Sequence, residues 1–377
     1  MPDGPSEEAR GAATPPRVAA FISGHGFGHA ARASAVLARL HATTGCRVEL
    51  FTTAPGWFFE ESIAGIFRYH QETVDVGFRQ ASALDYDLEA TVAALGDILP
   101  FGRRVERLAK EVAKADCRAV LCDISPLGVA VAEAAGLPSI VVENFTWGWL
   151  YEPLHVRAPE LEAFGRELDD WLMQADVHLQ ARPVCLRLES AELVDPISRA
   201  PRRPREETRA ALGVGEDERL VVVTMGGYGE SLPFLPRLRE RRGVRFLVTG
   251  ADATGEDGNL LLFDNNTPLF MPDLMRAADA LVAKLGYGTV SAVWREGLPF
   301  LGVTRADFRE MEALEAFARA ELRGRVIAPG VFKSGAWIEE LDALLGTERR
   351  PREGGGASRV AEALAEVAGL SPPSGGR

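Results

Sequence analysis

Short apolar runs alternate with segments of helical periodicity along most of the chain. A first series begins with the run at 18–22, which an alanine-rich helical segment at 33–40 follows, and a second series begins with the run at 219–225. Apolar runs of this length between amphipathic helices are typical of buried parallel strands. The pattern predicts an α/β protein with two doubly wound parallel sheets. The other runs lie at 47–53, 119–123, 139–142, 245–249, 280–283 and 298–303.

Proline and arginine gather between the two series, at 195–209. Such a change in composition marks a domain boundary, and 377 residues with 46% hydrophobic content are too many for one ordinary core. We predict an N-terminal domain at 17–198, a C-terminal domain at 205–348, and an amphipathic helix at 357–370 that packs back on the first domain. Residues 1–16, rich in Pro, Gly, Ala and Glu, are predicted to be a disordered leader.

A glycine- and histidine-rich segment, SGHGFGHAAR at 23–32, follows the first apolar run. A strand, a glycine turn and a helix in this order bring backbone amides and the positive helix N-terminus close to an anionic ligand. His25 and His29 lie where the loop becomes the helix, and imidazole is the side chain best suited to take a proton near neutral pH. The segment therefore indicates a reaction site. The structural alternative is that the glycines only turn the chain and the histidines cap the helix.

Residues 26–31 also fit the G-x-G-x-x-A form of a dinucleotide-binding fingerprint. Such a site needs an acidic residue at the end of the second strand, where it holds the ribose. The second strand here, at 47–53, carries its single acid, Glu49, in the middle. A nicotinamide or flavin site is therefore disfavoured.

Further candidate residues stand where predicted strands end. Asp123 ends the run at 119–123, so it is placed to face the same cleft as the glycine loop. It also fits a helix cap before Pro126, and position alone leaves both roles open. The aromatic segment 143–151, with Asn144 and Trp147, follows the next strand and fits either a core or an acceptor surface.

The second series carries two more glycine turns. Gly226, Gly227 and Tyr228 follow its first strand, and the segment KLGYGTVS at 284–291 follows a later one and opens a helix. Glycines and hydroxyls at a helix start form an anion cradle that suits a diphosphate, although a purely structural turn remains the alternative. The spacing is not that of a P-loop, which disfavours ATP bound in that manner. Beyond the run at 298–303, Arg305 and Glu310 are placed to reach a ligand.

The bulk charge and the cysteines exclude several classes of protein. A net charge of −12 argues against a nucleic-acid or anionic-membrane protein as a whole. The four cysteines show neither C-x-x-C pairing nor histidines at metal-ligand spacing, so neither a zinc site nor a disulfide framework is indicated. No apolar run has the length of a transmembrane span or a signal peptide, which predicts a cytoplasmic protein.

Together these motifs resemble the glycosyltransferases of the GT-B fold, in which two Rossmann-like domains face one another across a cleft. The similarity is closest to the glycosyltransferase-like N-terminal domain of plant arabinokinases and its stand-alone bacterial relatives. It rests on the segments 23–32, 144–151 and 284–291. More distantly, the chain is similar to the N-acetylglucosaminyltransferase of peptidoglycan synthesis and to plant small-molecule glycosyltransferases.

The resemblance implies inverting, metal-independent transfer of a hexosyl or pentosyl group from a nucleotide diphosphate sugar, expected to be a UDP-sugar, to an acceptor hydroxyl. His29 matches a histidine that in these families is the catalytic base or lies beside the acceptor. Asp123 matches the aspartate that the plant enzymes pair with this histidine. No cofactor and no metal are expected. The single D-x-D, Asp85-Tyr86-Asp87, precedes a helix and is interpreted as a cap and not as a metal site.

The predicted catalytic residues are His29, Asp123 and His25. The predicted donor-binding residues are Gly226, Gly227, Tyr228, Lys284, Gly286, Tyr287, Gly288, Thr289, Ser291, Arg305 and Glu310. The predicted acceptor-side residues are Gly26, Phe27, Gly28, Asn144 and Trp147.

One departure from the family pattern concerns the donor. In the usual motif Ser291 would be followed by a glutamate that holds the ribose, and this chain has Ala292. Glu296 and Glu310 are the possible substitutes. The departure leaves two alternatives to transfer open: a regulatory module that binds a nucleotide sugar without turnover, and a nucleotide-sugar epimerase.

Overall fold

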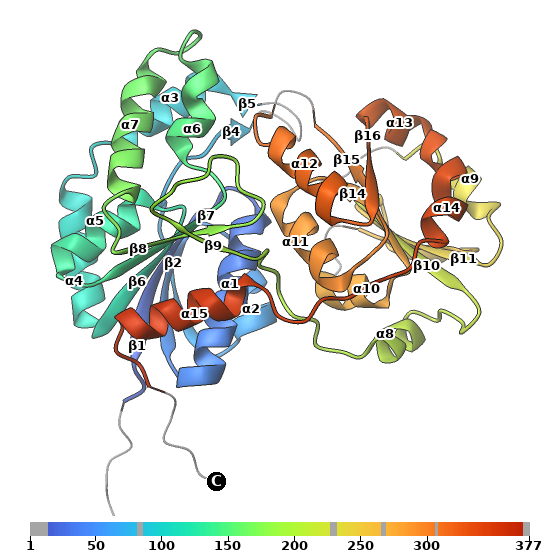
Figure 1. The fold of residues 1–377 in the computed structure, drawn as a ribbon, viewed down its shortest axis with the longest axis horizontal. Helices are drawn as coiled ribbons and strands as arrows, with labels where there is room; N and C mark the ends of the chain where they lie inside the picture. Colours follow the sequence, from blue (N-terminus) through green and yellow to red (C-terminus); the bar gives the residue numbers. More distant parts are fainter. Residues whose placement is uncertain (1–13, 81–85, 227–231, 265–268, 306–307, 372–377) are drawn as a thin grey trace, which may run out of the picture.

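The structure is a computed structural model that describes residues 14–80, 86–226, 232–264, 269–305 and 308–371 and forms two lobes side by side (Figure 1). Residues 1–13 of the predicted leader, and Gly227 and Tyr228 of the predicted donor site, lie outside the described residues.

The first lobe is built on a seven-stranded sheet with the order β3-β2-β1-β6-β7-β8-β9, in which every neighbouring pair is parallel. The central strands β1 and β6 end together, because Ile22 pairs with Asp123 in the register. The carboxyl end of β6 therefore lies beside the glycine loop that follows β1. The strands are β1 (Arg17–Ile22), β2 (Arg47–Thr52), β3 (Phe67–Gln71), β6 (Cys117–Asp123), β7 (Ser139–Glu143), β8 (Val177–Ala181) and β9 (Glu192–Val194).

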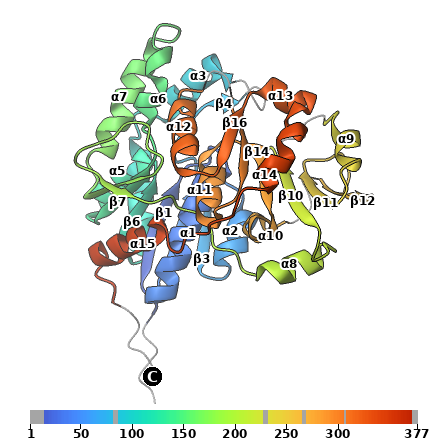
Figure 2. The same cartoon turned by 45° about the vertical axis from the view of Figure 1, so that its right-hand side comes forward.

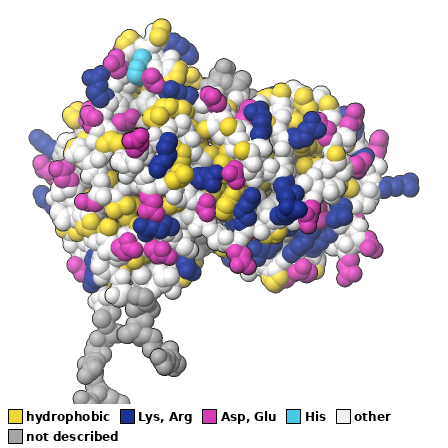
Figure 3. Space-filling view, viewed as in Figure 1, with side chains coloured by type: hydrophobic (Ala, Val, Ile, Leu, Met, Phe, Trp, Pro, Cys, Tyr) yellow, Lys and Arg dark blue, Asp and Glu magenta, His cyan; other side chains and the backbone are white. Residues whose placement is uncertain are grey.

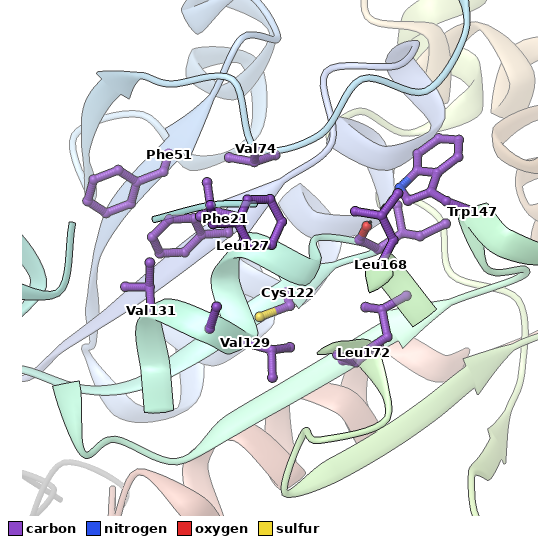
Figure 4. Packing of buried hydrophobic residues seen from close by; sticks show 14 of the residues in the cluster. Phe21, Phe51, Val74, Cys122, Leu127, Val129, Val131, Trp147, Leu168 and Leu172 are labelled. Carbon is purple, nitrogen blue, oxygen red and sulfur yellow. Dashed lines mark hydrogen bonds between the residues drawn. The ribbon is translucent and has the colours of Figure 1, made fainter. Parts of the chain in front are cut away.

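Helices cover both faces of this sheet. On one face, Phe21 and Phe51 pack with residues of α5 and α7 such as Leu127 and Leu168 (Figure 4). On the other face, α1, α2 and the C-terminal α15 bury apolar side chains against the same strands. The helices of this lobe are α1 (Phe27–Thr44), α2 (Gly56–Ile63), α3 (Leu88–Ile98), α4 (Arg103–Lys114), α5 (Pro126–Ala135), α6 (Trp147–Tyr151), α7 (Glu160–Leu172) and α15 (Gly356–Val367). A short hairpin, β4 (Arg79–Gln80) and β5 (Tyr86–Asp87), precedes α3.

The second lobe repeats the plan with a seven-stranded sheet of order β12-β13-β11-β10-β14-β15-β16, parallel except for the β12–β13 pair. Its strands are β10 (Arg219–Thr224), β11 (Val244–Thr249), β12 (Gly255–Asp257), β13 (Leu260–Phe263), β14 (Ala280–Lys284), β15 (Phe300–Val303) and β16 (Gly324–Ile327). Its helices are α8 (Arg205–Ala211), α9 (Leu235–Arg239), α10 (Met271–Ala277), α11 (Tyr287–Glu296), α12 (Met311–Glu321), α13 (Pro329–Ser334) and α14 (Leu341–Leu345). The two sheets confirm the predicted fold class.

The chain passes between the lobes twice, at 195–204 and again between α14 and α15 (Figure 1). The two passages touch, since the Gly356 amide donates a hydrogen bond to the Pro196 carbonyl at 3.4 Å. Both views place α11 and α12 at the boundary with the first lobe (Figures 1 and 2). The carboxyl ends of β1, β6 and β14 therefore meet at one interface.

Candidate active site

The loop between β1 and α1 requires glycine for two different reasons. Gly26, which precedes the first residue of α1, has φ +88°, a backbone conformation that side chains with a Cβ rarely adopt. At Gly24 an added Cβ would collide with the Thr53 hydroxyl. The chain thus reaches the helix in a turn tight enough to bring the first turn of α1 to the end of β6.

His29 and Asp123 form a hydrogen-bonded pair at this point, with 2.8 Å between His29 Nδ1 and Asp123 Oδ1. Burial alone would raise the pKa of the Asp123 carboxyl, but Arg32 and His29 lower it below its ordinary range. An ionised carboxylate only accepts hydrogen bonds, so Nδ1 carries the proton and Nε2 is left with its lone pair. That arrangement prepares Nε2 to act as a base.

The capping role considered for Asp123 belongs to Ser125. The Ser125 side chain accepts a hydrogen bond from the Gly128 amide at the start of α5, and Pro126 occupies the first turn. Ile124, which lies between Asp123 and Ser125 in the chain, has φ +50° and is fully buried. This conformation is strained for a β-branched residue, and it turns the chain directly after Asp123.

Arg32 is a member of this cluster that the sequence did not single out. Its Nε donates to Asp123 Oδ2 at 2.8 Å and its Nη2 donates to Oδ1 at 2.6 Å. Its remaining terminal nitrogen, Nη1, donates to the Asn144 side-chain oxygen. The signal was present, because residues three apart on a helix share a face and Arg32 follows His29 by three.

His25 lies against aromatic rings. Its imidazole packs edge-on to Trp147 at 5.8 Å and to Phe78 at 6.4 Å between centroids. Burial, with the positive charges of His29 and Arg305, lowers the pKa of His25 to about 4. His25 is therefore neutral at physiological pH, and it is too weak a base to serve as the general base near neutral pH.

The predicted acceptor-side residues divide into two groups. Asn144 and Trp147 are buried behind the histidines; the Trp147 indole donates to the Ile124 carbonyl at 3.2 Å. Phe27, by contrast, is 42% exposed and lies 5.7 Å from Trp57, which is 58% exposed. These two rings form an accessible aromatic surface beside the glycine loop, where Gly26 and Gly28 also lie.

The second lobe brings its own glycine turn to the same place. A Cβ added to Gly288 would lie 3.6 Å from Gly28 Cα, so the first turns of α1 and α11 are in contact across the interface. Gly286 precedes α11, and Tyr287, Gly288, Thr289 and Ser291 lie within its first turns. Lys284 ends β14, and its ammonium group lies 3.5 Å from the position of a Cβ on Gly226.

Other contacts fix the lobes against each other around this point. The Tyr287 hydroxyl lies 2.9 Å from the Cys185 thiol of the first lobe. Arg309 pairs with Glu152 at 2.7 Å and stacks on the Trp149 ring at 4.2 Å. The interface at which α1 meets α11 is thus fixed from the side of α6 and α12.

The two possible ribose carboxylates are both engaged. Glu296 is buried and is bonded to Arg349 at 2.6 Å and to Arg276 at 3.3 Å. Glu310 pairs with Arg305 at 2.7 Å. Arg305 stacks on the Phe308 ring at 4.0 Å. Glu296 is therefore held in a structural ion pair. Arg305 of the second pair lies close enough to His25 for its charge to lower the pKa of that histidine.

Within the part of the chain that the structure describes, no three His, Cys, Asp or Glu side chains gather as a metal ion would require. Asp87 caps α3 by accepting from the Ala90 amide at 2.8 Å, as predicted, and Asp85 lies outside the described residues. None of the described helices is both long enough and apolar enough to traverse a lipid bilayer.

The chain matches no established protein-family profile. It is 29% identical over 305 residues to the L-arabinokinase of Arabidopsis thaliana, an alignment that covers 77% of this chain and 28% of that protein. The chain thus corresponds to little more than a quarter of its curated relative.

Solved structures of glycosyltransferases resemble the whole chain. The glycotransferase of kitacinnamycin superimposes with a TM-score of 0.62 at 17% identity, covering 94% of this chain and 99% of its own. UGT2 of Phytolacca americana, solved with UDP-2-fluoro-glucose and pterostilbene, superimposes with a TM-score of 0.60 at 12% identity, covering 94% and 100%. The chain therefore has the GT-B glycosyltransferase fold.

Proposed function

We propose that the protein is an inverting glycosyltransferase that moves a sugar from a nucleotide diphosphate sugar to an acceptor hydroxyl. The observation that carries the proposal is the His29–Asp123 pair, 2.8 Å apart, on a helix whose first turn meets the glycine turn of α11. His29 Nε2 takes the hydroxyl proton of the acceptor while the acceptor oxygen attacks the anomeric carbon. The bond from that carbon to the diphosphate oxygen breaks, and its electron pair leaves with the diphosphate.

The donor site belongs to the second lobe. Amides at the start of α11, from Gly286 to Thr289, and the Lys284 ammonium supply positive charge where the leaving diphosphate gains negative charge. Gly226 lies beside Lys284. Gly227 and Tyr228 belong to the proposed donor site on the ground of the sequence alone. We propose a UDP-sugar as the donor. The polar side chains that we expect to bind its sugar are Arg305 and Glu310.

The acceptor approaches from the first lobe. The exposed rings of Phe27 and Trp57, tilted by 56° against each other, offer apolar faces of the kind that aromatic compounds and sugar rings bind. We propose metal-independent chemistry because helix N-termini and Lys284 provide the charge that a divalent ion provides elsewhere. Chelators should then leave the rate unchanged.

The binding-only alternative rests on Ala292 together with the engagement of Glu296 by two arginines, since no free carboxylate then follows Ser291 on α11.

We also propose that the protein is located in the cytoplasm. Its four cysteines, three of them buried, are free thiols, and a reducing compartment keeps thiols in that state.

The test follows diphosphate release from a panel of nucleotide sugars, with and without acceptors. Release that needs an acceptor supports transfer, release without one supports hydrolysis or epimerase chemistry, and binding with neither supports the regulatory module. His29→Gln should lower kcat by about 100-fold or more. The matched control is His41→Gln at the other end of α1, where the imidazole Nδ1 bonds to the Cys46 carbonyl at 2.9 Å. This variant should keep its activity. An active His29→Gln protein would refute the assignment.

A further inference from the structure

We infer that Arg32 is a positioning residue of this site: it holds Asp123 in place and neutralises its charge, so that the proton taken up by His29 is balanced by the bound diphosphate and not by Asp123. The inference rests on the proposed function for its second half. Its first half, the control of Asp123 and His29 by Arg32, stands on the geometry of the free protein.

The guanidinium grips both oxygens of Asp123. Nε reaches Oδ2 at 2.8 Å and Nη2 reaches Oδ1 at 2.6 Å, the fork that matches a carboxylate most closely. His29 shares Oδ1 with this fork. The three side chains are 6%, 2% and 11% exposed for Arg32, Asp123 and His29, so water screens their charges little.

The far side of the guanidinium is fixed as well. Nη1 donates to the Asn144 oxygen, and the Asn144 amide nitrogen donates to the carbonyls of Ala181 at 2.5 Å and Pro183 at 3.1 Å. Arg32 therefore connects α1 to the ends of β6, β7 and β8. This chain of bonds sets the plane of the Asp123 carboxylate, which in turn orients the His29 ring and selects the tautomer with the proton on Nδ1.

The charge of the cluster distinguishes it from a simple histidine–aspartate pair. In such a pair, proton uptake by histidine takes the net charge from −1 to 0. With Arg32 included, the same step takes the cluster from 0 to +1 inside a buried site. The positive product state is favourable only when a negative group lies opposite, and the glycine turn of α11 is where the proposed diphosphate binds.

Other charged or titratable groups surround the cluster, and they are the same in the wild type and in variants of Arg32. On the first lobe they are His25 in the loop, Glu143 at the end of β7, and Asp75 in the segment that follows β3. From the second lobe, Tyr287 of α11 faces Arg32, and Arg305 faces His25. Because none of them bonds to both Asp123 oxygens, a change in the behaviour of His29 on substitution of Arg32 reports on the fork.

The test measures the ring nitrogens of His29 by ¹⁵N NMR in the free protein, with the resonance assigned by its absence in His29→Gln. We expect the Nδ1–H tautomer in the wild type. Arg32→Met should move the midpoint of the His29 titration upward by about one pH unit or more, because the Asp123 charge is then uncompensated. Arg32→Lys, which keeps the charge but loses the fork, should shift it less and mix the tautomers.

The matched control is Arg199→Met, since Arg199 is an equally buried arginine, 8% exposed, that pairs with Glu61 at 2.7 Å outside this cluster. It should leave the His29 signals unchanged. An unaltered tautomer and midpoint in Arg32→Met would overturn the inference. If Arg32→Met does not fold, Arg32→Lys decides: retention of the pure Nδ1–H tautomer there would overturn it.

The second measurement adds UDP to the wild type, which requires no variant. UDP should move the His29 midpoint upward, and an unchanged midpoint in a UDP-saturated sample would overturn the diphosphate half. Where an acceptor is found, the acid limb of the kcat/KM profile should also move to higher pH in Arg32→Met. A protein without transferase activity would refute the proposed function but leave the result on the free protein intact, so the two failures are distinguishable.

Discussion

Asp75 and Asp123 are two buried carboxyls on either side of the β1–α1 loop, and their surroundings shift their pKa values in opposite directions. Asp123 has Arg32 and stays ionised. Asp75 accepts a hydrogen bond from Ser23 at 3.0 Å through Oδ1, while its Oδ2 has no hydrogen-bond partner among the described residues. Burial raises the pKa of Asp75 from 3.8 to about 7, although the hydrogen bond from Ser23 lowers it in part, and the charge of Asp123 adds to the rise. Of the two carboxyls, Asp75 is therefore the one whose ionised form is disfavoured by burial.

Asp75→Asn should stabilise the protein above pH 7. The native state binds the Asp75 proton more tightly than the unfolded chain, so its stability falls as pH rises from about 4 to 7. Asparagine keeps an acceptor for Ser23 and removes the buried charge, which gives a gain of about 2–4 kcal/mol at pH 8 that vanishes near pH 4. Urea unfolding at both pH values measures it, with exposed Asp97→Asn as the control. Equal stability of variant and wild type at pH 8 would contradict the raised pKa.

Sequence reasoning at this scale found residues that act through a motif and missed those that act through contacts. His29 was found because it follows a glycine turn, and Asp123 because it ends a strand. Asp75 was missed because its partner Ser23 lies 52 positions away and its polar segment shows no periodicity. The role of Asn144 was missed for the same reason: its contacts on Arg32, Ala181 and Pro183 exist only in the folded lobe.

Among the helices, α6 and α7 cross at a pair of glycines. A Cβ on Gly165 would lie 2.9 Å from Gly148 Cα, closer than side chains tolerate. α6 also carries Trp147, the ring on which His25 packs. The glycine contact thus sets the depth at which α6 sits behind the catalytic loop.

Gly165→Ala should destabilise the protein by about 1–3 kcal/mol, because the methyl group pushes α6 away from α7. The matched control is Gly96→Ala on α3, where the nearest heavy atom lies 3.9 Å from the added Cβ. Alanine there should stabilise by about 0.5–1 kcal/mol through helix propensity. Thermal unfolding of both variants tests the pair, and a Gly165→Ala protein as stable as Gly96→Ala would show that the helices can move apart freely.

Elements with a long apolar run were predictable, and the shortest strands were not. The sequence predicted β1, β6, β10 and β14 within two residues at each end, since each is a buried run of five to seven residues. It missed β9 and β12, which have three residues each and exist through pairing with a neighbour. Edge strands of this length carry no period of their own.

On the face of the molecule that Figure 3 shows, acidic and basic side chains are interspersed over both lobes. The exclusion of a nucleic-acid partner stays a prediction from the net charge of −12. The existence of two sheets was predictable because the strand–helix series occurs twice. That the two glycine loops face one another follows from the resemblance to GT-B enzymes. The direct contact of Gly28 with Gly288 does not, since it depends on how the two chain passages orient the lobes.

α15 packs on the first lobe, although it is the last helix along the described chain and follows the second lobe in the sequence. Val360, Ala361, Ala363 and Leu364 are buried against α1 and the sheet, and Arg359 pairs with Glu192 at 2.7 Å. α15 therefore covers the apolar face of α1, the helix that carries His29 and Arg32. The chain segment between α14 and α15 also connects the second lobe to the first.

Deletion of residues 358–377 should lower the melting temperature and the rate of transfer while sparing nucleotide binding. Each large apolar side chain of α15 contributes about 1.5–3 kcal/mol through burial, and its loss exposes α1. The residues proposed to hold the diphosphate, 284–291, lie wholly in the second lobe, so UDP should still bind in calorimetry. Leu364→Ala, which removes one fully buried side chain, should cost about 2–5 kcal/mol and serve as the milder control. Loss of UDP binding at an unchanged melting temperature would instead make α15 part of the donor site, and the assignment of one ligand to each lobe would then be wrong.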